Sequence, residues 1–511
     1  MVCTVYSAGI QGINGYIITV ECSSSGGLPE VNIIGLPDNS VRESLSRIES
    51  ALKNNGLPFI KGRTVINLAP ADTKKEGSYL DLAVLVSLLC HTELRGEDMS
   101  DKCFLGEISL TGELRPLKGV LSMCIAAKNH GKTKIFLPAD NAREAALIDG
   151  IQVYGISDIK QLLSHLKGDS LITPMVFSQF DIEFCPAPAV DFSEIKGQNF
   201  AKRAMEVAAA GGHNILLIGP PGSGKSMISK ALPGILPSMT YDEIIEVTKI
   251  HSVAGTLIPD GKLMSNRPFR SPHHTLSVFG LSGGGANPLP GEVSLAHNGV
   301  LFLDELAQFE KRALEVMRQP IEDKQITVTR VKGKVSFPAN FMLVCAMNPC
   351  PCGHFGNPFR ECTCSSKAIT NYLSKLSGPL LDRIDIQIEM PAISYDDITN
   401  AQPGESSHSV RQRVQAARKI AEQRFSDIGI HKNADASGAL IRERGNITDN
   451  AASILELAFS KLNMSARTFD RILRVARTIA DIEQSEHIEE NHIMEALQYR
   501  AADKKYFNRQ F

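Results

Sequence analysis

The chain has 511 residues, of which 43% are hydrophobic and 22% charged, and its formal net charge is −2. Domains commonly hold about 150 residues, so this length predicts about three domains, and the composition excludes a wholly disordered chain. The nearly neutral charge excludes a uniformly basic surface. Binding to a nucleic acid would therefore need a local patch, or a channel made by several subunits.

The sequence indicates a cytoplasmic protein without membrane contact. The longest apolar run, at residues 82–90, has about half of the roughly 20 residues that a membrane span needs. The first cationic residue is Arg42, so a secretion signal with a basic start is not expected. Thiols stay reduced in the cytoplasm, and the 11 cysteines are therefore not expected to form a disulfide framework.

Residues 1–180 predict a first domain of mixed α and β structure. Short apolar runs alternate there with Gly and Pro turns and a few helical patterns. Asp38 is a suitable N-cap for a helix, which the Gly-Leu-Pro sequence at 56–58 would end. The predicted elements are strands at 31–35, 64–68 and 134–137 and helices at 38–52 and 79–89.

The rest of the chain divides into two more predicted domains. Residues 185–190 contain two prolines and predict an extended linker. Residues 191–392 form the second domain, which contains most of the recognisable motifs. Residues 393–511 predict a helical third domain. A polar break lies at 402–408, and apolar residues recur with helical period at 410–425, 451–462 and 466–481.

A phosphate-binding loop follows an apolar segment at 214–219 and precedes a helical segment at 227–232. It fits the pattern G-x-x-x-x-G-K-[ST] in the strand–loop–helix context that this pattern requires. The glycines let backbone N–H groups turn toward phosphates. Lys225 can reach the β- and γ-phosphates, and Ser226 can bind Mg²⁺. The predicted ATP-binding residues are Gly219, Pro220, Pro221, Gly222, Ser223, Gly224, Lys225 and Ser226.

A second apolar segment, at 299–305, ends in two adjacent carboxylates, Asp304 and Glu305. Side chains alternate along a strand, so the two carboxylates are expected to have different roles. Asp304 would hold Mg²⁺ through water, and Glu305 would polarise the attacking water. The pair therefore predicts ATP hydrolysis rather than ATP binding alone.

Two polar residues elsewhere in the second domain, Asn348 and Arg383, are candidates for contact with the γ-phosphate. Asn348 ends the apolar segment 341–348 and could orient the attacking water; alternatively, it is a turn residue before proline. Arg383 could neutralise charge during phosphoryl transfer. Its neighbours Asp382 and Asp385 leave a surface salt bridge as the alternative.

Arg467, Arg471 and Arg474 have the i, i+4, i+7 spacing of one helix face. This basic stripe is either solvated or places an arginine on ATP from a helical lid, and Arg467 is favoured for that role. His273 and His274 are another adjacent pair. They are more simply read as a positioned loop pair than as metal ligands.

Four cysteines form two C-x-C pairs, Cys350 with Cys352 and Cys362 with Cys364. Four thiolates from two short turns can bind Zn²⁺ in a tetrahedral structural site. The spacing is not the usual C-x₂-C, and His354 could replace one cysteine. The alternative is a set of free thiols in a loop.

These motifs resemble AAA+ ATPases of the magnesium-chelatase-like group and, more closely, the bacterial ComM/YifB family. The most specific stretches are 267–275, 283–297, 347–353 and 376–385. The resemblance implies a homo-hexameric ring with ATP sites between subunits. Arg383 would then reach the neighbouring subunit's γ-phosphate, and Arg467 would be the second sensor in the lid.

The resemblance also implies two insertions, a helical one at 268–285 and a hairpin at 325–338. Arg330, Lys332 and Lys334 in the hairpin would bind the phosphates of branched or single-stranded DNA without sequence preference. The alternative is a solvated strand edge. The implied activity is ATP-driven helicase and branch-migration work in homologous recombination and natural transformation.

The segments 106–119 and 134–141 resemble the proteolytic domain of Lon. Ser78 is the serine nearest to the nucleophile position, but residues 120–123, where Lon has its catalytic lysine, contain no lysine. The expected fold is therefore α/β overall. It comprises a Lon-protease-like (ribosomal S5 domain 2-like) α+β domain without peptidase chemistry, an AAA+ P-loop domain with a parallel sheet, and a helical lid.

Two other functions remain open at this stage. One is an ATPase motor subunit of a metal-chelatase or protein-remodelling complex. The N-terminal domain and the cysteine pairs favour the DNA motor, because both belong to the ComM/YifB resemblance. The other is an ATP-gated scaffold, against which Glu305 argues because a pure switch needs no hydrolytic base.

Overall fold

The computed structural model describes residues 2–60, 62–176, 190–257, 264–285, 288–330, 333–393, 404–462 and 464–507. The chain forms two compact units, one of Met1–Phe184 and Tyr241–Ser265, the other of Cys185–Thr240 and Asn266–Phe511. We call them the N-terminal unit and the second unit. The predicted linker at 185–190 lies outside the described residues except for Val190, and the polar break at 402–408 is described only from Gly404 onward.

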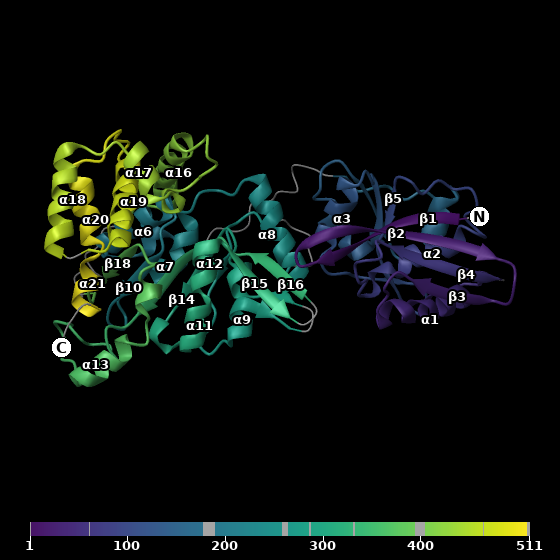
Figure 1. Cartoon of the computed structure of the whole chain (residues 1–511), viewed down its shortest axis with the longest axis horizontal. Helices are drawn as coiled ribbons and strands as arrows, with labels where there is room; N and C mark the ends of the chain where they lie inside the picture. The colour runs from purple at the N-terminus through teal and green to yellow at the C-terminus, as the bar shows by residue number, and fades with distance from the viewer. Residues whose placement is uncertain are drawn as a thin grey trace. The chain divides into compact units, whose positions relative to one another are not determined.

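Three sheets and their helices make up the described part of the N-terminal unit (Figure 1), and the smallest sheet pairs β6 with β7. The first has the order β1-β2-β4-β3, in which only β3 and β4 are parallel, and the second has the parallel order β5-β8-β9. The strands are β1 Val2–Gln11, β2 Asn14–Ser25, β3 Glu30–Ile34, β4 Arg63–Ala69, β5 Lys102–Phe104, β6 Glu107–Ile108, β7 Leu114–Arg115, β8 Lys134–Pro138 and β9 Gln152–Ile156. The helices are α1 Asn39–Asn54, α2 Asp81–Leu89, α3 Val120–Asn129, α4 Ala142–Ala145, α5 Ile159–Leu166 and α8 Tyr241–Ala254.

The sequence signals for these elements act as predicted. The Asp38 carboxylate accepts a hydrogen bond from the Val41 N–H at 2.8 Å and so caps helix α1. The predicted strands at 31–35, 64–68 and 134–137 are β3, β4 and β8 within one or two residues. The predicted helix at 79–89 starts two residues later, because Ser78–Leu80 form a 3₁₀ turn before α2.

Helix α8 follows the phosphate-binding loop in sequence but packs within the N-terminal unit. Its Tyr241 hydroxyl donates to the Leu147 carbonyl at 3.0 Å, and the Gly119 N–H donates to the Ser252 carbonyl at 3.2 Å. The Ser252 hydroxyl also donates to Glu144. The chain therefore passes between the units three times, which no pattern in the sequence indicates.

A five-stranded parallel sheet of order β11-β14-β17-β10-β18 lies at the centre of the second unit. Its strands are β10 Ile215–Ile218, β11 Phe269–Arg270, β14 Val300–Leu303, β17 Met342–Met347 and β18 Ile386–Glu389. Ile215 and Leu217 enter one hydrophobic cluster, and Leu216 and Ile218 enter another. Both faces of the sheet are thus covered, as a parallel sheet requires.

Short hairpins and helices surround this sheet. The hairpin strands are β12 Gly283–Gly284, β13 Leu289–Pro290, β15 Gln325–Arg330 and β16 Gly333–Pro338. The helices are α6 Asn199–Gly211, α7 Lys225–Ala231, α9 Val278–Ser282, α10 Glu292–Leu295, α11 Lys311–Val316, α12 Arg318–Asp323, α13 Ser366–Leu373 and α14 Gly378–Leu381. The expected insert at 268–285 thus contains only one short helix, α9.

The C-terminal part is helical, as predicted, and shares one hydrophobic cluster with a face of the sheet. Its helices are α16 Ser407–Arg424, α17 Gly438–Arg444, α18 Asp449–Leu462, α19 Ala466–Ile482, α20 Glu490–Gln498 and α21 Ala501–Tyr506. Within this region, the buried Asp481 carboxylate of α19 accepts hydrogen bonds from Arg424, Asn433 and Arg477. No helix in the described part of the chain is both long and apolar enough to cross a membrane.

Candidate nucleotide-binding site

The phosphate-binding loop runs from the end of buried strand β10 into helix α7. Gly222 and Gly224 have φ angles of 79° and 86°, which an L side chain rarely adopts. A Cβ atom at Gly219 would lie 2.4 Å from the Met390 carbonyl oxygen. The glycines are therefore required by the shape of the loop itself, independently of any ligand.

Lys225 is buried behind this loop. Its Nζ donates to the carbonyl oxygens of Gly219 and Pro220, both at 2.8 Å, and lies 3.4 Å from Oδ1 of Asn348. Burial lowers the pKa of Lys225 to about 8, although the Asp304 carboxylate opposes the shift. The ammonium group is held by exchangeable carbonyl contacts, so it can turn to a phosphate oxygen.

Ser226 and Asp304 meet at the end of strand β14, and Glu305 follows directly in the sequence. The Ser226 hydroxyl donates to Asp304 Oδ2 at 2.6 Å, which pairs the two residues predicted to hold Mg²⁺. Hydroxyl and carboxylate oxygens are ligands that Mg²⁺ prefers, so this pair fits the ion. Glu305 has a φ angle of 51°, and its carboxylate lies 3.5 Å from His274 Nδ1 rather than beside Ser226. This is consistent with a separate role for the Glu305 carboxylate.

Asn348 follows strand β17, which lies between β10 and β14. Parallel strands end at the same edge of a sheet, so Asn348 comes beside the loop and the carboxylates. Its Oδ1 contacts the Lys225 ammonium group, which joins Asn348 to the phosphate-binding loop. The sequence thus predicted the four groups that meet here, because each one follows a strand in a local motif.

The candidate arginines lie around a separate cavity of about 650 Å³. Arg383, Arg467, Arg471 and Arg474 all line it, and no residue of the loop 219–226 is among its described lining residues. Of the alternatives for Arg383, the salt bridge is present, but with Glu322 on α12 rather than with Asp382 or Asp385. The Nε of Arg383 has no hydrogen-bond partner in the described part of the chain.

The basic stripe on α19 is not uniformly solvated. Arg467 is exposed, whereas Arg471 is 4% exposed, and burial lowers the pKa of Arg471 to about 10 against the opposing effect of Asp385. Arg471 lies 3.8 Å from Asp382 and 3.9 Å from Asp385, and its Nη1 has no hydrogen-bond partner among the described residues. Sequence spacing alone does not distinguish these three arginines.

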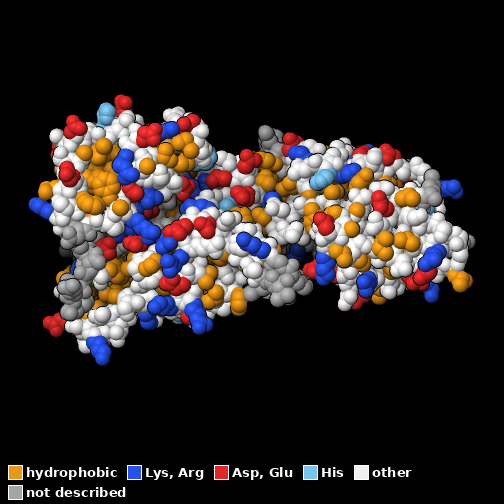
Figure 2. All heavy atoms as spheres, viewed as in Figure 1, with side chains coloured by type: hydrophobic (Ala, Val, Ile, Leu, Met, Phe, Trp, Pro, Cys, Tyr) orange, Lys and Arg blue, Asp and Glu red, His pale blue; other side chains and the backbone are white. Residues whose placement is uncertain are grey.

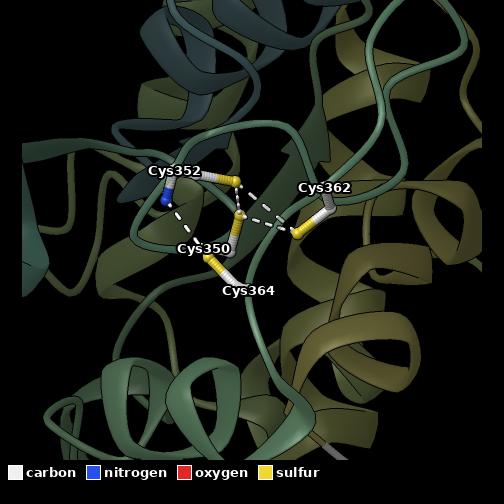
Figure 3. A group of neighbouring side chains, drawn as sticks. All are labelled: Cys350, Cys352, Cys362 and Cys364. Carbon is white, nitrogen blue, oxygen red and sulfur yellow. Dashed lines mark hydrogen bonds between the residues drawn. The ribbon is translucent and has the colours of Figure 1, made fainter.

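The four cysteines of the two C-x-C pairs come together, as Figure 3 shows. The Sγ atoms of Cys350 and Cys352 are 3.4 Å apart, and that of Cys362 is 3.6 Å from each. Cys364 Sγ accepts the Cys352 N–H at 3.4 Å, and all four sulfurs lie within 4.8 Å of one another. A tetrahedral Zn–S₄ site with bonds of about 2.3 Å has sulfurs about 3.8 Å apart, which is near the three separations of 3.4–3.6 Å.

The electrostatics of this cluster favour one thiolate. Burial opposes ionisation of Cys352, but N–H groups of His354 and Thr363 and neighbouring thiols outweigh it and lower its pKa to about 5. Burial, together with the contact to Cys352, raises the pKa of Cys350 to about 12. His354 is not part of the group; its Nδ1 lies 3.3 Å from the Asn357 amide nitrogen.

The expected hairpin at 325–338 is present as β15 and β16, with Arg330 opposite Gly333 and Thr329 opposite Lys334. Lys334 is exposed. The side chain of Arg330 and the whole of Lys332 lie outside the described residues. In the N-terminal unit, the Ser78 hydroxyl donates to the Glu107 carboxylate, and the helix that contains 120–123 has no lysine in that stretch.

Sequence comparisons agree with this arrangement. Three family models match: "Magnesium chelatase, subunit ChlI" over residues 191–398, "Subunit ChlI of Mg-chelatase" over 20–141, and "Magnesium chelatase, subunit ChlI C-terminal" over 404–500. The fold and the site therefore define an ATPase of the AAA class. The chain belongs to the magnesium-chelatase ChlI-like family, whose members include proteins named YifB and ComM.

Two relatives extend over nearly the whole chain. YifB of Escherichia coli is 40% identical over 98% of this chain and 97% of its own, and "Competence protein ComM" of Haemophilus influenzae is 39% identical over 97% of each. A Lon protease of Finegoldia magna is 26% identical over 167 residues, or 30% of this chain and 21% of the protease. One ChlI model covers part of the N-terminal unit, so that unit does not by itself separate a chelatase subunit from a DNA motor.

Three structural features near the site were not predicted from the sequence. They are the ion pair of Glu322 with Arg383, the burial of Arg471, and the approach of His274 to Glu305. Each joins segments that are far apart along the chain or depends on which helix face is covered. Such information comes from contacts between distant residues, and local patterns in one sequence do not contain it.

Proposed function

We propose that this protein is an ATP-hydrolysing ring motor that acts on DNA, with helicase and branch-migration activity in homologous recombination and natural transformation. The single observation that supports hydrolysis best is the meeting of Lys225, Ser226, Asp304 and Asn348 at one sheet edge. The name of the Haemophilus influenzae relative, a competence protein, favours a role with DNA.

Each residue of the site has a distinct part in the proposed reaction. Lys225 binds the β- and γ-phosphates, and Ser226 with Asp304 holds Mg²⁺, which neutralises phosphate charge when bound. Glu305 orients and deprotonates the attacking water, and Asn348 contacts the γ-phosphate and that water.

The arginine cavity supports a site shared between subunits. Arg383 and Arg467 face one cavity of their own chain, away from the loop that would hold that chain's ATP. In a homo-hexamer both would contact the nucleotide of the neighbouring subunit, and their cationic groups would stabilise the transition state for phosphoryl transfer. Arg471 adds a third, more deeply buried positive charge to the same surface.

DNA would be bound locally rather than by a whole face. In the view of Figure 2, Lys and Arg side chains are interspersed with Asp and Glu, in keeping with the net charge of −2. The exposed Lys334 on hairpin β15–β16, with Arg330 and Lys332 at its tip in sequence, provides the proposed phosphate contacts. Six such hairpins in a ring would give the channel that a nearly neutral chain requires.

Two further assignments belong to this proposal. Cys350, Cys352, Cys362 and Cys364 hold a structural Zn²⁺ that fixes the loop between Asn348 and helix α13. The N-terminal unit has a Lon-protease-like fold without peptidase chemistry, for which the similarity to Lon is the support. Ser78 there donates a hydrogen bond to the Glu107 carboxylate, and residues 120–123 contain no lysine that could activate it.

The first test measures steady-state ATP hydrolysis with and without a four-way DNA junction, for the wild type and for Glu305→Gln. We expect the junction to stimulate hydrolysis and the variant to abolish it while still binding ATP. Hydrolysis that no DNA alters would instead favour the motor subunit of a metal-chelatase or protein-remodelling complex, the alternative that the ChlI family models suggest.

A mixing experiment tests the shared site. Lys225→Ala lacks its own ATP site and Arg383→Ala lacks the proposed contribution to a neighbour, so each alone should be inactive. If sites lie between subunits, mixed rings contain some sites with both wild-type residues and recover activity. If the mixture stays inactive while both variants co-assemble in size-exclusion chromatography, Arg383 acts within its own subunit.

A further inference from the structure

The loop that contains the four cysteines packs against the phosphate-binding loop. We call residues 348–365 the cysteine loop; all of them are described, and they form no helix or strand. Gly353, one residue after Cys352, is buried and has a φ angle of 82°. A Cβ atom there would lie 2.6 Å from Cδ of Pro221 and 2.8 Å from its Cγ. The backbone at Gly353 therefore lies directly on the Pro221 ring, and only a glycine fits.

The contact between the two loops extends on either side of this point. The Gly219 N–H donates to the carbonyl of Met347, the last residue before the cysteine loop, at 3.2 Å. A cavity of only about 80 Å³ is lined by Gly219 and Pro220 together with residues 355–358 of the cysteine loop. Little space is thus left between them, and the cysteine loop forms one wall of the phosphate-binding loop.

The cysteine loop is also attached to helix α21 and strand β18. The ring of Phe355 meets the ring of Tyr506 edge to face, with centroids 6.3 Å apart. The Tyr506 hydroxyl and Lys505 Nζ donate to the carboxylate of Glu389, the last residue of β18, at 2.7 and 2.6 Å. These contacts hold the middle of the loop in place, so the shape of the part ahead of Phe355 depends on how its ends are joined.

The ends of the cysteine loop are joined through sulfur, as Figure 3 shows. Cys362 Sγ lies 3.6 Å from the Sγ atoms of Cys350 and Cys352, and Cys364 Sγ accepts the Cys352 N–H at 3.4 Å. A stretch of this length without helix or strand has many conformations unless it is cross-linked. A metal ion bound by the four thiolates supplies that cross-link and favours the one shape that supports the phosphate-binding loop.

We propose that Zn²⁺ bound by the four cysteines holds the phosphate-binding loop in its ATP-binding shape, so that zinc and ATP each strengthen the binding of the other. This inference rests on the proposed zinc and ATP sites and links them. Coupling between two sites is reciprocal, so the factor by which zinc tightens ATP binding is also the factor by which ATP tightens zinc binding. The cysteine loop thereby makes nucleotide loading depend on metal occupancy.

The test measures the dissociation constant of a fluorescent, non-hydrolysable ATP analogue in excess Mg²⁺. The full-length protein is compared with zinc bound and after treatment with a nitrogen-donor chelator, which prefers Zn²⁺ to Mg²⁺. Metal analysis reports the zinc content, and circular dichroism reports the fold. Pro221→Ala removes the ring atoms that Gly353 contacts. Pro58→Ala, at an exposed proline of the N-terminal unit, is the matched control.

We expect zinc removal to raise the dissociation constant about tenfold in the wild type and in Pro58→Ala, a factor typical of coupled sites. Pro221→Ala should bind the analogue more weakly even with zinc, and its constants with and without zinc should be nearly equal, because the contact that links the sites is missing. Equal constants with and without zinc in the wild type would overturn the inference, as would a wild-type ratio in Pro221→Ala.

The reciprocal measurement decides the question if the metal-free protein unfolds. Competition with a chromogenic chelator gives the zinc affinity of the folded protein with and without a saturating concentration of the analogue. We expect the analogue to tighten zinc binding about tenfold in the wild type and to leave it nearly unchanged in Pro221→Ala. An unchanged zinc affinity in the wild type would contradict the coupling.

Failure of the proposed function gives a different pattern. Neither measurement uses DNA or hydrolysis, so both outcomes stand if no DNA stimulates the ATPase. A protein that binds the analogue but takes up no zinc would remove the zinc assignment and this inference together. A protein that binds both ligands independently would remove this inference alone.

Discussion

The guanidinium of Arg383 forms an ion pair with the carboxylate of Glu322. The arginine side chain is 12% exposed, while the glutamate is 56% exposed at the rim of the arginine cavity. A guanidinium that is occupied by a carboxylate cannot also bind a phosphate with the same nitrogens. On the proposed function, a neighbouring nucleotide that binds the same nitrogen of Arg383 has to displace the Glu322 carboxylate.

Substitutions of the two members of this pair should change the kcat of ATP hydrolysis in opposite directions. Arg383→Ala should lower kcat by about 10³-fold, the scale of a trans-acting arginine, with little change in ATP binding. Glu322→Gln should raise kcat a few-fold because it frees Arg383. Arg318→Ala, which removes an exposed ion pair with Glu315, is the control in the same ATPase assay. A normal rate in Arg383→Ala would contradict its assignment.

ATP affinity should fall as the pH rises above about 8. Burial lowers the pKa of Lys225 to about 8, so above this pH the free protein must take up a proton before its ammonium can bind phosphate. The dissociation constant should then rise up to about tenfold per pH unit, and stay flat below pH 8. Binding titrations from pH 7 to 10 test this. Lys225→Arg, whose guanidinium stays charged, should bind with no such dependence; the same slope in both proteins would disprove it.

Zinc should be present in the purified protein at about one ion per chain. Cys362→Ser should lower the zinc content to near zero and reduce the melting temperature, because the loop after Asn348 loses its cross-link. Metal analysis and thermal unfolding measure both effects. Cys124→Ala, in helix α3 of the N-terminal unit, removes a buried thiol outside the cluster and should retain zinc. Equal zinc contents in the two variants would rule out the site.

Binding to a four-way DNA junction, whose arms are duplex, should depend on salt through Lys334. Each phosphate contact adds about 0.9 to the slope of log K against log salt concentration. Lys334→Ala should reduce that slope by about one for each subunit that contacts DNA, whereas Lys334→Arg should keep it. Fluorescence anisotropy at several salt concentrations gives the slopes. Identical slopes for all three proteins would place the DNA elsewhere.

Loss of the buried Asp481 should destabilise the helical region strongly. Its carboxylate is the acceptor for Arg424, Arg477 and Asn433, and Arg477 is fully buried. Asp481→Ala leaves the buried Arg477 and the mostly buried Arg424 without their carboxylate partner and should cost about 3–5 kcal/mol. Asp427→Ala removes an exposed pair with Arg444 and should cost far less, because solvent screens that pair. Denaturant titration measures the free energy of unfolding of both variants. Equal losses would show that the buried network stabilises the protein no more than an exposed ion pair does.

The sequence predicted the parts of this molecule that are encoded locally. The cap at Asp38, the strand before Gly219 and the periodic helix that begins at Ala466 are each set by residues within one turn or one strand. Because parallel strands share an edge, the motif residues Ser226, Asp304 and Asn348 could also be expected to meet.

What the sequence did not predict depends on contacts between distant segments. Arg467 and Arg471 occupy the same helix face, yet only Arg471 is covered, because the segment around Asp382 and Asp385 packs over it. Similarly, Glu322 has no sequence feature that marks it as the partner of Arg383. Burial and pairing of this kind are tertiary properties, and periodicity carries no information about them.

Helix α8 has a consequence for how this protein can be divided. A fragment that starts after residue 190 would still contain Tyr241 and Ser252 but not the surface formed by Leu147, Glu144 and Gly119. A fragment that stops near residue 180 would keep that surface and lack the helix. Two fragments divided near residues 180–190 are therefore not expected to fold independently. In designed exchanges between relatives, residues 1–184 and 241–265 have to be transferred together.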